Sequence, residues 1–146
     1  IAYTSAVYCS VLSCKTNIVF LESYVSQTNV FGEPIDECCS HPMTGYFRDG
    51  FCRTSKYDQG SHTVCALITD AFLVFSQSRG NDLSTPRPEF EFPGLAEGQS
   101  WCLCAARWLE AHEAGCAPKV HLKRTNIETL KIVPMDILRG YATDLN

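Results

Sequence analysis

Residues 80–108 read GNDLSTPRPEFEFPGLAEGQSWCLCAARW, and this stretch carries the densest local signals in the chain. Its three prolines exclude a helix, since proline lacks a backbone donor and fixes φ, so we expect an ordered, extended loop. Trp101–Cys104 then predicts a short strand that leads directly into a helix over Ala105–Ala114. Gly115 would end that helix, and the stretch therefore places a loop, a strand and a helix in succession.

The segment before this stretch predicts a strand and a helix. His62–Ile68 is β-branched and almost continuously apolar, as expected of a central strand. Thr69 can cap a following helix with its hydroxyl, and Asp70 suits the positive N-terminal end of that helix. Gly80 stands where a glycine commonly ends a helix, so we expect the helix to stop just before it.

Further elements are expected on either side of this central region. Gly45–Cys52 places aromatic residues on both sides of Asp-Gly, a pattern that predicts a β-hairpin. Lys119–Leu122 is a candidate strand. Thr125–Glu128 has the spacing of a capping box, in which a hydroxyl and a carboxylate satisfy the first backbone donors of a helix. Pro134 suits the first position of a last helix that would extend through Tyr141.

Together these patterns predict an α+β fold. We expect a single compact domain over residues 29–146, with a small mixed or antiparallel sheet and three or four short helices. Residues 1–28 contain no proline or glycine and are rich in Val, Ile, Thr, Tyr and Ser. We interpret them as an N-terminal extension with two β-like runs.

Composition narrows the class of protein. Of the 146 residues, 45% are hydrophobic and 19% are charged, which is typical of one globular domain. The formal net charge is −4 and no basic run exceeds Lys123-Arg124, which argues against a nucleic-acid partner. No apolar run approaches the ~20 residues of a membrane-spanning helix. Because the chain begins at Ile1, we expect a processed product in a plastid or mitochondrion after transit-peptide removal, or a cytoplasmic protein.

The chain has nine cysteines, at positions 9, 14, 38, 39, 52, 65, 102, 104 and 116. Their proportion is too low for a scaffold built on disulfides, and several lie in apolar segments. We therefore expect most of them to be reduced, partly buried thiols in a reducing compartment. A secreted protein with disulfides is the alternative, and it would leave at least one thiol over.

The Cys102-Leu103-Cys104 step is the sharpest chemical feature. Alternate residues of a strand share a face and lie about 6.5–7 Å apart, so both thiols should point to the same side. A zinc site would need two further ligands. The candidates for those ligands are Cys38, Cys52, Cys65 and His62. No cysteine pair has the Cys-x-x-Cys spacing of structural zinc, so we favour packing of Cys102 or Cys104 as small hydrophobic residues. We therefore predict no cofactor, and zinc is the alternative.

Three other side chains are candidates for chemistry. His62 could act as a general base toward a thiol, although capping a turn or binding a buried carbonyl is the favoured role. Asp82 could be an acid, a base or a ligand, or it could bond its own backbone in a turn. Arg107 lies one helical turn from the Cys-x-Cys step and could bind an anion or pair with a carboxylate. Together with Cys102 and Cys104, these residues form the candidate catalytic set.

Several segments of the chain resemble one known family. They are Asn29–Pro34, Pro42–Gly50, Gly60–Cys65, Gly80–Pro88, Phe92–Leu95 and Trp101–Trp108. The family consists of small, mostly bacterial proteins, with members in algae and plants, and is termed domain of unknown function 2237. Cysteines of the family pattern match Cys38, Cys52, Cys65, Cys102 and Cys104. Phe51 replaces a frequent second cysteine and His41 a frequent aspartate, which counts against a metal site that uses those positions. The resemblance implies no established activity.

Two classes of function are therefore carried forward. The first is an accessory or binding subunit of a larger assembly, docked on a protein partner through residues 1–28. The alternative is a thiol- or metal-dependent enzyme centred on the Cys-x-Cys strand and His62, or a small-ligand pocket roofed by the loop over Asn81–Leu95. The enzymatic motifs for phosphate, dinucleotide and serine-hydrolase chemistry are absent from the sequence, so it does not decide whether the protein is an enzyme.

Overall fold

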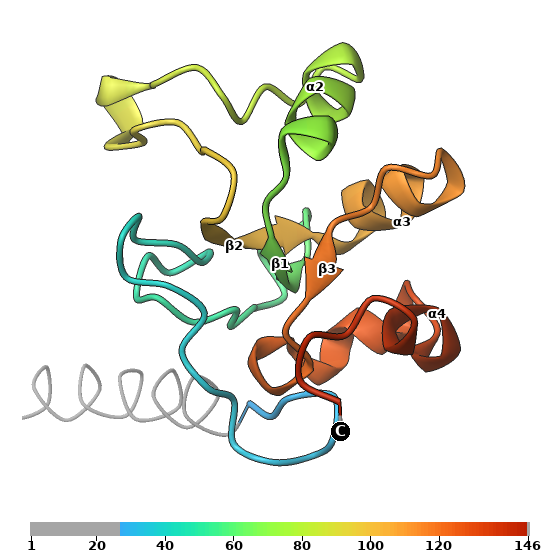
Figure 1. Cartoon of the computed structure of the whole chain (residues 1–146). Coiled ribbons are helices and arrows are strands. Elements are labelled where there is room, and N and C mark those ends of the chain that lie inside the picture. The colour runs from blue at the N-terminus through green and yellow to red at the C-terminus, as the bar shows by residue number, and fades with distance from the viewer. Residues whose placement is uncertain (1–26, 146) are drawn as a thin grey trace, which may run out of the picture.

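The structure is a computed structural model of the chain, and residues 27–145 are described. Three antiparallel strands form a sheet in the order β2-β1-β3 at the centre of the molecule (Figure 1). The strands are β1 (His62–Leu67), β2 (Ser100–Cys104) and β3 (Lys119–Val120). The predicted extension over residues 1–28 lies almost entirely outside the described residues. Its expected protein partner and the expected compartment stay predictions.

Short helices surround this sheet. The α-helices of the described residues are α2 (Asp70–Ser78), α3 (Ala105–Glu113) and α4 (Met135–Arg139). Single 3₁₀ turns cover Pro88–Phe90, Leu122–Arg124 and Ile127–Lys131. The predicted α+β class, with an antiparallel sheet and few short helices, is confirmed.

The ends of α2 follow the prediction. The Thr69 hydroxyl accepts a hydrogen bond from the Phe72 amide at 3.1 Å and caps the first turn. Gly80 follows the helix with φ of 84°, a conformation that glycine adopts without steric cost. The proline-containing segment then arches away from α2 and returns to the start of β2, as the yellow tube in Figure 1 shows. This segment closes one end of the molecule above the sheet.

The two faces of the sheet contribute to different cores. In β1, Val64 and Ala66 join a large apolar core, whereas Cys65 between them faces the opposite side, as the period of a strand requires. The large core receives Phe72, Leu73, Trp108, Ala111 and Leu138 from the three α-helices. The small core consists of Ile35, Cys38, Cys52, Cys65 and Cys102. A non-helical segment before β1 therefore covers one face of the sheet with cysteines.

The hairpin predicted over Gly45–Cys52 is wrong. This segment forms turns and bends without strands. The Gly50 carbonyl accepts hydrogen bonds from the amides of Cys38 and Cys39, and the Gly50 amide donates to Thr44. The turn residues therefore bond to a distant segment instead of pairing two flanking strands.

The C-terminal elements are displaced by a few residues from their predicted positions. The strand predicted over Lys119–Leu122 ends at Val120. Asn126, not Thr125, caps the turn that follows, because its side chain accepts from the Glu128 amide at 3.0 Å. The Thr125 hydroxyl is already engaged with Cys65 and His121. The last helix begins after Pro134 and is shorter than expected.

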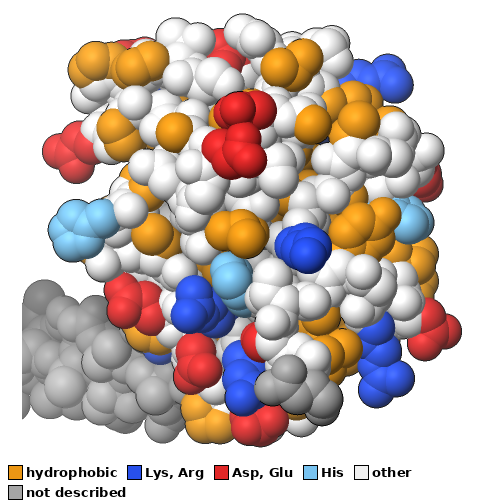
Figure 2. Space-filling view, in the orientation of Figure 1, with side chains coloured by type: hydrophobic (Ala, Val, Ile, Leu, Met, Phe, Trp, Pro, Cys, Tyr) orange, Lys and Arg blue, Asp and Glu red, His pale blue; other side chains and the backbone are white. Residues whose placement is uncertain are grey.

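The surface carries both signs of charge. Figure 2 shows acidic and basic side chains interspersed on one face, with apolar side chains scattered among them. Among residues 27–145, no helix is long and apolar enough to cross a membrane.

Candidate active site

His62 at the start of β1 is held by a buried carboxylate. The Oδ1 atom of Asp58 lies 2.6 Å from His62 Nδ1. Its Oδ2 atom accepts from the His62 amide and from the Thr54 hydroxyl, both at 2.9 Å. The Asp58 side chain is 1% exposed, whereas that of His62 is 42% exposed. A carboxylate acceptor at Nδ1 favours the tautomer with its proton there, which leaves Nε2 as the unprotonated ring nitrogen.

Gly60 and Ser61, which directly precede His62, determine where the imidazole ring lies. A Cβ atom at Gly60 would lie 2.5 Å from His62 Cε1, so the ring packs directly over Gly60 and would have to shift if that residue carried a side chain. Ser61 adopts a positive φ of 47° and turns the chain into the strand. Its carbonyl accepts from the Ala105 amide at 3.0 Å, which joins the start of β1 to the start of α3.

A cavity of about 200 Å³ opens beside this histidine. It is lined by Gly60, His62, Asn81, Leu83, Trp101, Leu103, Cys104 and Arg107. Three of the predicted catalytic candidates, His62, Cys104 and Arg107, therefore lie around one space. Asn81 and Leu83 come from the segment that we expected to roof a ligand pocket. Because candidate catalytic residues line this space, we refer to it as the active-site cavity.

Cys104 contributes a half-buried free thiol to the active-site cavity. It is the Cα partner of His62 in the antiparallel register and the residue that directly precedes α3. Within residues 27–145, no hydrogen bond joins its sulfur to His62. The Cys104 thiol and the His62 imidazole therefore line the same cavity without bonding to each other.

Arg107 and Asp82 have different surroundings. Arg107 lines the active-site cavity while its Nη1 donates to the Arg79 carbonyl at 3.1 Å and to Glu110 Oε2 at 3.3 Å. Asp82 lies in the adjoining turn, where its carboxylate accepts from the Thr85 hydroxyl and from the amides of Ser84 and Thr85. The Thr85 hydroxyl bond, followed by the two amide bonds, lowers the pKa of Asp82. This is the turn interaction that the sequence offered as the alternative to chemistry.

The Cys-x-Cys step does not present both thiols to one face. Cys102 points into the small core, whereas Cys104 lines the active-site cavity with Trp101 and Leu103. The β1–β2 register shifts between His62 and Val64, and Cys104 is where the strand turns into α3. The regular alternation of a strand therefore ends before Cys104, and the expected shared face is wrong.

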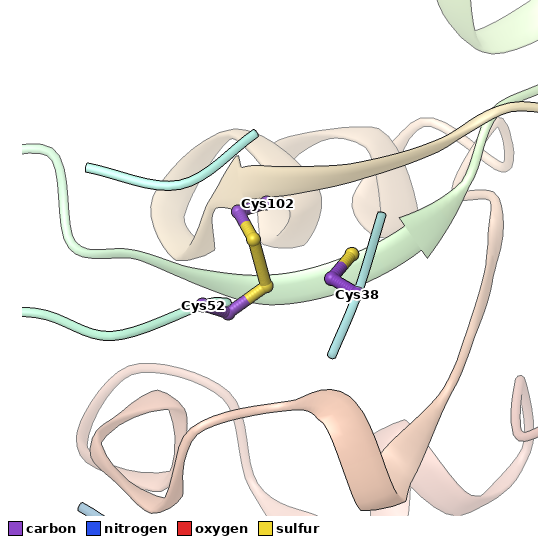
Figure 3. Close-up of side chains that lie close together, drawn as sticks. All are labelled: Cys38, Cys52 and Cys102. Atoms are coloured by element: carbon purple, nitrogen blue, oxygen red, sulfur yellow. A yellow bond between two sulfur atoms is a disulfide. The ribbon is translucent and has the colours of Figure 1, made fainter. Parts of the chain in front are cut away.

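Four of the other predicted metal candidates converge on the far side of the sheet. Disulfides join Cys38 to Cys65 and Cys52 to Cys102, with Cα–Cα distances of 5.8 and 5.2 Å. We call these four residues the cysteine cluster. Figure 3 shows the Cys52–Cys102 disulfide with the Cys38 sulfur beside it. The sulfur atoms of Cys38, Cys52 and Cys102 all lie within 4.8 Å of one another.

The pairing corrects the expectation that most cysteines are reduced. Of the seven cysteines in the described residues, four form disulfides and three, Cys39, Cys104 and Cys116, are free. The bonded partners are 27 and 50 residues apart in sequence. No local spacing of cysteines in the sequence predicts these pairs, because the β1–β2 register and the packing of the segment before β1 bring the sulfurs together. Cys9 and Cys14 lie outside the described residues.

Comparison with known proteins places this arrangement in a family. Residues 28–142 match the model of a family described as an uncharacterized protein conserved in bacteria (DUF2237). The chain belongs to the DUF2237 family. The resemblance stated from the sequence motifs is thereby confirmed. No curated protein matches the chain. The active-site cavity and the cysteine cluster both lie within the part of the chain that matches DUF2237.

Asp58 is the site residue that the sequence analysis missed. It lies in a polar loop, Arg53–Gly60, where an aspartate is ordinary. The only signal is its position four residues before His62, with the tight Gly60-Ser61 turn between them. That spacing lets one carboxylate reach both the amide and the ring of His62.

Proposed function

We propose that the protein is a thiol-dependent enzyme that acts on a small, negatively charged carbonyl compound in the active-site cavity. The observation that carries this proposal is that His62, oriented by the buried Asp58, borders the same 200 Å³ cavity as the free thiol of Cys104. Cys104 is the nucleophile and His62 transfers protons. Asp58 orients the imidazole and does not itself meet the substrate.

The chemistry follows from the arrangement of these groups. Cysteine is partly ionised at neutral pH and strongly nucleophilic, so its sulfur can attack a carbonyl carbon placed between it and His62. His62 Nε2 takes the proton of the Cys104 thiol and gives it to the leaving group as the bond between that group and the carbonyl carbon breaks. The acyl group remains on Cys104 as a thioester. His62 Nε2 then removes a proton from water, which releases the acid and restores the thiol. A histidine in this role typically contributes about 100- to 10,000-fold to the rate.

The preference for an anion rests on two groups at the cavity wall. Arg107 brings a guanidinium to the lining. The cavity also reaches Cys104, the residue directly before the nine-residue helix α3, where backbone amides and the helix dipole favour negative charge. A carboxylate on the substrate would meet both. The cavity volume restricts the substrate to a small molecule.

Alkylation of the intact, oxidised chain tests the nucleophile and the anion site together. Iodoacetate carries a carboxylate, whereas iodoacetamide is neutral and has the same reactive carbon. Peptide mass spectrometry follows each thiol separately, with Cys116 as the internal reference. We expect iodoacetate to modify Cys104 at least about tenfold faster than Cys116, and His62→Gln to reduce that rate. Arg107→Gln should abolish the preference for iodoacetate over iodoacetamide.

A matched histidine variant provides the control. His41→Gln changes an exposed histidine outside the active-site cavity and should leave the alkylation rate of Cys104 unchanged. The same variants are then tested for hydrolysis of small thioesters that carry a carboxylate. A Cys104 thiol that reacts no faster than Cys116, and that does not respond to His62→Gln, would contradict the proposal.

A further inference from the structure

We propose that the cysteine cluster is a zinc site in its reduced state and that the two disulfides are its oxidised, metal-free form. The ligands are Cys38, Cys52, Cys65 and Cys102, which excludes His62 and Cys104 from the metal candidates that the sequence offered. This inference concerns the opposite face of the sheet and does not depend on the proposed enzymatic function.

The sulfur positions are close to those that zinc requires. Zinc–sulfur bonds of about 2.3 Å in a tetrahedron place the sulfur atoms about 3.8 Å apart. The sulfurs of Cys38, Cys52 and Cys102 already lie within 4.8 Å of one another, and Cys65 is bonded to Cys38. Four thiolates around one point are the ligand set that selects zinc among the common divalent ions. Small side-chain rotations would therefore convert one arrangement into the other.

The backbone holds the four cysteines in place without help from the disulfides. The amide of Cys102 donates to the Thr44 hydroxyl at 2.8 Å, and that of Cys65 to the Thr125 hydroxyl at 3.2 Å. The Cys38 amide donates to Gly50, and the Cys52 carbonyl accepts from Asn126. The β1–β2 register also pairs Cys65 with Cys102. When the sulfur–sulfur bonds are reduced, we expect these backbone contacts to keep the four cysteines close together.

Two of the four buried cysteines border hollows of the surface. A second cavity, of about 270 Å³, has Cys102 in its wall together with Tyr46, Arg48 and His62, so it adjoins the active-site cavity. A surface hollow of about 320 Å³ has Cys38 in its wall. Cys38 and Cys102 are therefore the members of the cluster that border surface hollows, whereas Cys52 and Cys65 are fully buried. Arg48 also places a positive charge near a site that would carry a net charge of −2 when four thiolates bind Zn²⁺.

The oxidation balances with hydrogen peroxide as the oxidant. Four thiolates, two molecules of peroxide and four protons give two disulfides and four molecules of water. Each pair of thiolates supplies two electrons to one peroxide as its disulfide forms, and the O–O bond of that peroxide breaks. The zinc ion keeps its oxidation state and leaves because a disulfide sulfur carries no charge with which to bind it. Metal release and the loss of four thiols should therefore occur together.

Metal binding by the full chain tests this proposal. The protein is reduced with a trialkylphosphine, freed of reagent without air and mixed with Zn²⁺ or Co²⁺. We expect about one ion per chain after gel filtration, and a cobalt spectrum with thiolate charge-transfer bands of tetrahedral geometry. The oxidised chain should bind no metal. Peroxide added to the zinc form should release the ion to a chromophoric chelator as four thiols disappear.

Single substitutions assign the ligands. Cys52→Ser and Cys65→Ser should each weaken zinc binding by at least about 100-fold, since even residues that only orient metal ligands contribute roughly 10- to 100-fold. Cys116→Ser, a free cysteine outside the cluster, should bind zinc as the wild type does. If a ligand variant does not fold, the proposal is tested on the reduced wild type alone, by its cobalt spectrum and by the rise in its Tm when metal is added. A reduced chain without bound metal, or Cys52→Ser and Cys65→Ser variants that bind it normally, would overturn the proposal.

Discussion

Asp58 is a carboxylate with 1% exposure whose two oxygens accept three hydrogen bonds at the start of β1. In Asp58→Asn one of these acceptors becomes an N–H donor that faces another donor, so a buried group loses its partner. We expect the free energy of unfolding to fall by about 1–3 kcal/mol, measured by urea denaturation. Asp36→Asn, at an exposed position, should change it little. Equal stability of the two variants would show that Asp58 is not held as described.

His121 makes the stability of the protein depend on pH. Burial, followed by the charge of Arg124, lowers the pKa of His121, and Asp144 opposes that shift. The unfolded chain therefore takes up the proton first as the pH falls below the ordinary histidine value of 6.5. The contribution of neutral His121 to stability is complete above that pH and is lost as the pH falls toward the folded pKa.

This dependence can be isolated with one variant. Between about pH 7 and about pH 5, the free energy of unfolding should decrease more for the wild type than for His121→Gln, because glutamine at position 121 does not titrate. Urea denaturation at both pH values measures the difference. Parallel losses in the two proteins would contradict the assignment to His121.

Single residues explain how much of the site the sequence could predict. His62, Cys104 and Arg107 stand out because each lies beside an apolar element with a recognisable pattern. Asp58 does not, because its role depends on a turn geometry that a polar loop does not reveal. The pairing of Cys52 with Cys102 depends on contacts 50 residues apart, so no spacing rule could have found it.

At the scale of elements, the predictions succeeded where the determining contacts are local. The strand β1, the capped helix α2 and the passage from β2 into α3 each follow from residues within a few positions of one another. The predicted Gly45–Cys52 hairpin is wrong because the Gly50 carbonyl accepts from the amides of Cys38 and Cys39, and no pair of strands forms on the two sides of the Asp-Gly turn. Turn-forming residues can fix a change of direction without fixing which strand, if any, follows.

Thr44 shows how this segment is fastened to β2. It is fully buried, and its hydroxyl accepts the Cys102 amide at 2.8 Å. Thr44→Val keeps the shape of the side chain and removes the acceptor, so an edge amide of β2 is left without a partner. We expect a loss of about 1–3 kcal/mol in the free energy of unfolding. Thr85→Val, whose hydroxyl bonds Asp82 on the surface, should have a smaller effect because water can replace it. A larger effect at Thr85 would contradict this account.

At the scale of the whole molecule, the two disulfides connect the segment before β1 to the sheet. The bridges close loops with sequence separations of 27 and 50 residues, each of which stabilises a protein by about 3–4 kcal/mol when considered alone. The loops overlap, so the two contributions are not additive. We expect reduction with a phosphine, in the presence of a metal chelator, to lower the urea midpoint of unfolding. An unchanged midpoint would mean that the bridges are not formed in the native protein.

The order of the bonded cysteines along the chain has a further consequence. Cys52 lies inside the loop closed by Cys38 and Cys65, and its partner Cys102 lies outside it. A single cut of the backbone anywhere between Cys38 and Cys102 therefore falls inside at least one disulfide-closed loop, so a disulfide still joins the two pieces. A protease that cleaves after the exposed Lys56 would leave two pieces that migrate as one species until a reductant separates them. After a nick between Cys38 and Cys102, the oxidised protein therefore keeps both fragments joined by a disulfide, and reduction removes that covalent link.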